Sequence, residues 1–197
     1  MARSIVGLSP RAMTRSKHPM RFAAALVALL SLPVFAPGCA SHSKTVPLLS
    51  AAGIPVTMTP TSAVPLEVVT RSTAIDDPLP VTGSDTFYAD VESALGHAIA
   101  SATVPWADAH RQQRPEGWQI LVEITRASAD YSAGRLMVTF DVRATLRTRI
   151  GNAYLAQTQA HCMQAGLVAP SDGAPVVYSC MTGLGRDLGG WLGSVEP

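Results

Sequence analysis

Residues 136–147 carry the sequence pattern that most constrains the fold. Apolar side chains occupy the even positions, and the odd positions are mostly polar or charged: Met137, Thr139, Asp141, Arg143, Thr145 and Arg147. Successive side chains of a strand point to opposite faces of a sheet. Period two sustained for twelve residues therefore predicts a long β-strand with one buried face and one face open to solvent or to a partner.

Three other segments have the composition or the alternation of strands. Residues 65–70 are rich in β-forming residues, and residues 118–124 and 154–162 alternate more weakly than 136–147. Turn residues separate the last three strands, at Ser132–Gly134 and at Ile150–Asn152. Short connections of this kind predict antiparallel neighbours, so 118–124, 136–147 and 154–162 are expected to form a three-stranded meander.

Two segments have helical periodicity instead. Apolar residues recur at three- and four-residue spacing from Phe87 to Ala102, with Ser84 or Asp85 as the expected N-cap and Pro105 as the expected stop. A second stripe runs from Val177 to Leu192 and includes several glycines. Each stripe predicts an amphipathic helix with one buried face.

These elements predict an α+β fold in the order β-α-β-β-β-α. We expect a mixed four-stranded sheet with a three-strand antiparallel meander, covered on one face by the two amphipathic helices. The other face is then wet or faces a partner. Its candidate partner-facing residues are Asp141, Arg143, Arg147, Gln157 and Gln159.

The amino-terminal segment has the pattern of an export signal. Residues 1–21 contain five basic residues and no acidic one, and residues 22–35 carry no charge. The small residues Ala36, Pro37 and Gly38 then precede Cys39. This segment resembles the signal peptides of bacterial lipoproteins, whose short motif ends in a cysteine. An ordinary cleaved signal and an uncleaved membrane anchor are the alternatives, and Met1, Met13 and Met20 are the possible starts.

The lipoprotein resemblance implies a division of the chain and a covalent modification. Residues 1–38 would be the signal peptide, residues 39–64, rich in Ser, Thr, Pro and Ala, a flexible tether, and residues 65–197 a single globular domain. Cys39 would carry a diacylglycerol and an N-acyl chain, which together make a stable membrane anchor. The expected location is the cell envelope, at the outer membrane facing the periplasm. No other cofactor is expected.

Charge and motifs exclude several classes of function. After residue 38 the chain has ten basic and fourteen acidic residues, which disfavours nucleic acid as a partner. No histidine pair has the spacing of a helical metal site, and no Gly-x-Ser-x-Gly or phosphate-loop motif occurs. We therefore expect no catalytic residues and no metal. A hydrolase stays as an alternative that would require Asp76, Asp77 or His110 to converge in a cleft.

Cys162 and Cys180 are a candidate disulfide. Cys162 ends an expected strand, Cys180 lies on the core-facing stripe of the last helix, and an exported domain folds in an oxidising compartment. The alternative is two small buried thiols, since the sequence does not give the distance between them.

The order of the elements and the leader together resemble a known class of protein. A lipoprotein signal, a short linker, a strand, a helix, a three-strand meander and a closing helix near Trp191 are similar to the auxiliary lipoproteins of ABC-type transport systems. This resemblance implies a non-enzymatic adaptor or accessory role in lipid or solute transport, with other envelope proteins as partners and a lipid or small molecule as a possible ligand. A structural or pilot lipoprotein of an assembly or secretion complex is the alternative.

Overall fold

The computed structural model describes residues 43–51, 53, 66–75, 77–113 and 116–196, all within one compact unit, Ala40–Pro197. The expected signal peptide and Cys39 lie outside these residues. In chain order the elements are β1 (Lys44–Pro47), α1 (Leu48–Ala51), β2 (Leu66–Ser72), β3 (Leu79–Thr82), β4 (Thr86–Ala89), α2 (Val91–Ala109), β5 (Trp118–Ser132), β6 (Arg135–Thr148), β7 (Tyr154–Gly166), a 3₁₀ turn η1 (Pro170–Asp172) and α3 (Ala174–Gly193).

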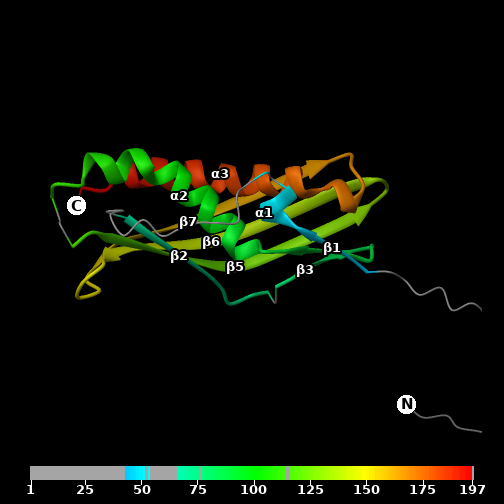
Figure 1. The fold of residues 1–197 in the computed structure, drawn as a ribbon, viewed down its shortest axis with the longest axis horizontal. Coiled ribbons are helices and arrows are strands. Elements are labelled where there is room, and N and C mark those ends of the chain that lie inside the picture. The colour runs from blue at the N-terminus through cyan, green and yellow to red at the C-terminus, as the bar shows by residue number, and fades with distance from the viewer. Residues whose placement is uncertain (1–42, 52, 54–65, 76, 114–115, 197) are drawn as a thin grey trace, which may run out of the picture. The chain divides into compact units, whose positions relative to one another are not determined.

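The fold is mixed α+β, as predicted, but its sheet has seven strands and not four. The strand order is β1-β4-β3-β5-β6-β7, and β2 pairs with β5 off this path. The predicted meander is confirmed, since β5, β6 and β7 pair antiparallel in that order. The predicted first strand is also confirmed as β2, which pairs parallel to β5. Figure 1 shows α2 and α3 on the same side of the sheet.

The long strand β5 joins the two parts of the sheet. Its first half pairs with β2, from Leu66 opposite Trp118 to Ser72 opposite Ile124. Its second half pairs with β3, which lies opposite Ala129 and Asp130. A break in register between Ile124 and Arg126 marks the change, consistent with a β-bulge that lets one strand serve two neighbours.

Three short strands were not predicted. β1 lies in the segment expected to be a tether, β3 in an expected proline-rich loop, and β4 at the expected start of the first helix. In β3, Leu79 and Val81 are buried while their neighbours are exposed, so a period-two pattern is present but only four residues long. β4 pairs with β3 and with β1. These pairings bring β1 and α1, which lie within residues 39–64, into the fold.

The first long helix begins later and ends later than predicted. α2 starts at Val91 after Asp90, so neither Ser84 nor Asp85 caps it and Phe87 belongs to β4. The helix also continues through Pro105 to Ala109. A proline in a helix removes one backbone hydrogen bond. Here the last turn is held by packing, because Trp106 is buried between His110 and Trp118, with ring centroids 4.5 and 5.7 Å away.

The second predicted helix is confirmed as α3, and it packs closely on α2. A Cβ placed on Gly185 would lie 2.7 Å from the Ala98 carbonyl oxygen, and one on Gly189 would lie 3.0 Å from that of Ala102. Moving four residues along α3, from Gly185 to Gly189, thus corresponds to moving four residues along α2, from Ala98 to Ala102. The two helices therefore run in the same direction. The buried apolar residues of both helices and of the even positions of β6 form one core between the helices and the sheet.

Within the part of the chain that the structure describes, no helix is both long enough and apolar enough to cross a membrane.

Candidate functional site

The sheet face that lies opposite α2 and α3 is the candidate site. On β6 the even positions from Leu136 to Leu146 are buried in the core, so the odd positions point to the other side of the sheet. The register extends this face across β2, β5 and β7, because residues that pair in a sheet point to the same side. We call it the open face. It includes Glu67, Arg71, Gln119, Glu123, Arg126, Asp141, Arg143, Thr145, Arg147, Gln157, Gln159, His161 and Met163.

A row of charged residues crosses the middle of the open face. Arg71 of β2, Glu123 of β5 and Arg143 of β6 lie side by side in the register. Arg71 forms an ion pair with one carboxylate oxygen of Glu123, and Arg143 lies 4.0 Å from the other. The two arginine side chains are 55% and 44% exposed, whereas that of Glu123 is 17% exposed. The carboxylate is thus recessed, and the row presents mainly guanidinium groups to solvent.

A second row of polar residues lies toward the start of β5. Arg147 donates a hydrogen bond to the Gln119 side-chain oxygen (2.7 Å), and the Gln119 amide donates to Glu67 (2.9 Å). Arg149, just beyond β6, lies 3.4 Å from the same carboxylate. Exposed ion pairs contribute little to stability, about 0–1 kcal/mol each. Their effect here is to fix the positions of the arginines on a surface that no described helix covers.

All five residues predicted to face a partner lie on this surface. Asp141 contacts His161 of β7, Gln157 is opposite Thr145, and Gln159 is opposite Arg143. Sequence reasoning missed the two residues that complete the charged row, Arg71 and Glu123. Alternation in 118–124 places Glu123 opposite to the buried residues of its strand, but the contact with Arg71 depends on the β2–β5 register.

The two candidate disulfide cysteines are joined in the structure. Cys162 of β7 and Cys180 of α3 form a disulfide, with their Cα atoms 5.7 Å apart. The bond ties the last helix to the last strand of the sheet.

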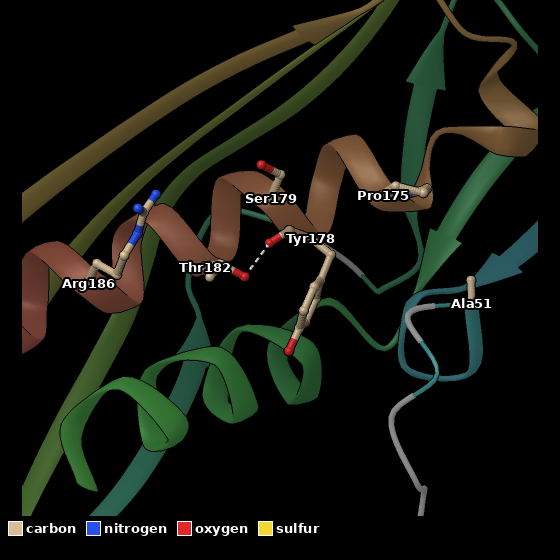
Figure 2. Close-up of a pocket in the computed structure, with 6 residues that line it drawn as sticks. All are labelled: Ala51, Pro175, Tyr178, Ser179, Thr182 and Arg186. Atoms are coloured by element: carbon tan, nitrogen blue, oxygen red, sulfur yellow. Dashed lines mark hydrogen bonds between the residues drawn. The ribbon is translucent and has the colours of Figure 1, made fainter. Parts of the chain in front are cut away.

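A groove on the helix side of the molecule is a second candidate. It has a volume of about 450 Å³ and is lined by Ala51 of α1 and, from α3, by Pro175, Tyr178, Ser179, Thr182 and Arg186. Figure 2 shows the Tyr178 ring directed toward α2 and the Arg186 guanidinium directed away from it. Thr182 donates its hydroxyl to the Tyr178 carbonyl within the helix (2.9 Å). A pocket that recognises a small ligand has converging polar groups, and these diverge.

Two residues named for the hydrolase alternative lie far apart. The backbone N–H groups of Asp90 and Val91, at the start of α2, donate to Asp77, whose pKa is raised by burial and then by the neighbouring carboxylate of Asp90. His110 follows the other end of α2 and contacts the Trp106 carbonyl oxygen (2.8 Å). A helix of this length separates its ends by about 27 Å. Asp76 lies outside the described residues.

Among the residues that the structure describes, no three His, Cys, Asp or Glu side chains lie close enough together to hold a metal ion.

Comparison with known proteins does not assign the chain to a family. No family model matches the sequence, and no curated protein does. Among solved structures, a Xanthomonas campestris protein of the family called DUF330 gives a TM-score of 0.48 at 15% identity, over 64% of this chain and 81% of its own. A candidate lipoprotein from Caulobacter crescentus gives 0.39 at 16% identity, over 67% and 93%. The Neisseria meningitidis lipoprotein GNA1162 gives 0.33 at 12% identity, over 60% and 95%.

Proposed function

We propose that this protein is a lipid-anchored component of the bacterial cell envelope that acts as a non-enzymatic adaptor. The anchor is the acylated Cys39, and the adaptor surface is the open face. Its partner is another envelope protein, in the first place a component of a lipid or solute transport system. The open face carries the proposal, because it is a largely polar surface of the sheet on which ion pairs and hydrogen bonds hold the arginines.

The chemistry of the open face points to an acidic partner surface. Two guanidinium groups stand above one recessed carboxylate in the row of Arg71, Glu123 and Arg143. Arginine binds carboxylate in a planar, two-point geometry, and exposed arginines steer the approach of an oppositely charged surface. Six of the ten basic residues that follow residue 38 lie on this face or at its ends, namely Arg71, Arg126, Arg135, Arg143, Arg147 and Arg149, against four acidic ones, Glu67, Glu123, Asp130 and Asp141.

The test uses the full chain in its own membrane. A photo-crosslinking amino acid at Thr145, in the centre of the open face, should capture an envelope protein, whereas the same group at Ser179 on the outer side of α3 should not. Arg71→Gln combined with Arg143→Gln should reduce capture from position 145 about tenfold, since close charge pairs at interfaces couple by about 1.5 kcal/mol or more. Capture from Ser179 alone would contradict the proposed surface.

The anchor is tested separately. Cys39→Ser should abolish labelling by a radioactive or clickable fatty acid and leave the unprocessed precursor. Normal acyl labelling of this variant would refute the anchor but would not bear on the open face, which the crosslinking experiment tests. If labelling is lost and capture at position 145 fails in the wild type, the anchor stands and the adaptor surface is wrong.

A further inference from the structure

The strand β7 forms one edge of the sheet. It pairs with β6 along its length, and it is the last strand in the sheet order. Within the described part of the chain no strand pairs with its outer side. A strand of 13 residues at an edge presents a long row of outward N–H and C=O groups that another strand can bind.

β7 lacks the features with which proteins usually block an open edge. Between Tyr154 and Gly166 there is no Lys, Arg, Asp, Glu or Pro, and the pairing with β6 is regular from Ala156 onward. On the other side of the sheet the outer strands are β1, which has four residues, among them Lys44 and Pro47, and β2, which pairs with β5 and carries Glu67 and Arg71. Short length, lysine and proline are standard protections against strand addition. Both outer strands on that side thus carry charged residues or proline, whereas β7 contains no Lys, Arg, Asp, Glu or Pro.

Exposed apolar side chains gather at the same edge. Six large apolar side chains are strongly exposed in the described residues, and four of them lie on β7 or in its flanking turns: Ile150, Tyr154, Met163 and Leu167. A fifth, Met137, lies on β6 opposite Ala165. On the core side, Ala160 and Cys162 are only partly buried, while their neighbours Val142 and Phe140 on β6 are buried. The core-side residues of β7 are therefore less completely buried than those of β6.

We propose that β7 pairs antiparallel with β7 of a second copy of this chain, which makes one continuous sheet across a two-fold axis. Two observations favour a second copy. The strand contains no Lys, Arg, Asp or Glu, so two copies of a chain with excess acidic residues meet there without repulsion between acidic side chains. Its polar side chains are mainly Gln157, Gln159 and Gln164, and an amide both donates and accepts, so it can pair with itself. A two-fold contact uses the same patch on both copies, which side chains that can pair with themselves permit.

The pairing fixes which residues meet. Full overlap of two antiparallel strands of residues 154–166 places the axis at Ala160 and sets Gln159 opposite His161 of the second copy. The two copies of Gln159 are then diagonal neighbours across the axis. Position 159 is therefore one of the two positions on the open face where a charge lies close to its own copy across the axis.

The experiment measures dimerisation of the acylated full chain in detergent by sedimentation equilibrium. Gln159→Lys and Gln159→Glu should each raise the dimer dissociation constant by up to about fivefold, because each places like charges diagonally across the axis. An equimolar mixture of the two variants should restore the wild-type constant, since the lysine introduced at position 159 of one copy is then the diagonal neighbour of the glutamate introduced at position 159 of the other. Thr145→Lys and Thr145→Glu are the matched controls on the interior strand β6, and they should leave the constant unchanged.

Three results would overturn the proposal. The wild-type protein could sediment as a monomer at all concentrations. The two charged variants could associate as the wild type does, which would place any dimer contact elsewhere. The mixture could fail to recover, which would show that the two copies of position 159 do not meet across the proposed axis.

Discussion

The contact between α2 and α3 predicts that glycine-to-alanine substitutions in α3 change the free energy of unfolding in opposite directions at different positions. The glycines of α3 fall into two groups. Gly185 and Gly189 lie against the backbone of Ala98 and Ala102, whereas a Cβ on Gly183 or Gly190 would meet no atom within 4 Å. Glycine within a helix is less favourable than alanine by about 0.5–1 kcal/mol. Replacement of Gly183 or Gly190 by alanine should therefore stabilise the protein by about that amount.

The same change at Gly185 should destabilise the protein. Its new Cβ would lie 2.7 Å from the Ala98 carbonyl oxygen and 3.1 Å from the carbonyl carbon, so the helices must separate by a few tenths of an ångström. Overpacking of this kind costs about 1–3 kcal/mol, which exceeds the gain in helix propensity. Gly189→Ala should fall between the two groups, because its nearest atom is 3.0 Å away.

The measurement is urea unfolding of the wild type and the four alanine variants, followed by circular dichroism at an unchanged m-value. Gly183→Ala and Gly185→Ala should differ by about 1–3 kcal/mol, equivalent to several degrees in Tm for a domain of this size. If all four variants gain stability equally, the helices do not meet at Gly185 and the described packing is wrong.

Two further predictions concern α3 and the segment before it. Burial, and then the nearby Asp172 carboxylate, raises the pKa of Tyr88 to about 12, and its hydroxyl donates to the Pro170 carbonyl (2.7 Å). The folded state favours the protonated Tyr88 hydroxyl. Its contribution to the free energy of unfolding is therefore complete below pH 10 and is lost as the pH rises from about 10 to 12. Tyr88→Phe should lower stability at neutral pH by about 1–3 kcal/mol and flatten the alkaline decline measured by urea unfolding; an equally steep decline in both proteins would contradict the assignment. Reduction of the Cys162–Cys180 disulfide should cost about 3 kcal/mol and should leave the stability of a Cys162→Ala/Cys180→Ala variant unaffected; no change on reduction of the wild type would refute the role of the bond.

The sequence predicted best those elements whose pattern is local and long. Residues 136–147 alternate without interruption, and β6 runs from Arg135 to Thr148. The stripe from Val177 to Leu192 likewise matches α3. In both cases the contrast between buried and exposed positions persists for more than ten residues. The two-residue period of a strand and the three- to four-residue period of a helix can then be told apart.

The errors occurred where a short pattern is completed by distant partners. Phe87 stands four residues before Val91 and fits the helical stripe, yet it lies in β4, whose partners are β3 and β1. The helix α2 continues past Pro105 because Trp106 packs against Trp118, nine residues beyond its end. A period can identify neither contact, since each depends on residues outside the local window.

The candidate site was likewise predicted in part, where it depends on a local pattern, and missed where it depends on distant partners. Alternation alone placed Asp141, Arg143 and Arg147 on one face, and the structure brings them together there. The arrangement that gives the face its character could not be predicted, because it requires Arg71 and Arg143 to lie on either side of Glu123. That arrangement comes from the parallel pairing of β2 with β5, which joins residues about fifty positions apart.

The disulfide and the unprotected edge of the sheet have a common physical basis. An edge strand is held by backbone hydrogen bonds on one side only, and β7 gains little from burial because its core-side residues are only partly covered. Cys162 lies near the middle of β7, and its bond to Cys180 fixes the strand to α3. A strand held in place in this way keeps its outward N–H and C=O groups ordered, so less conformational entropy is lost when a second strand binds. The covalent link thus favours strand addition at the edge that carries the exposed Tyr154 and Met163.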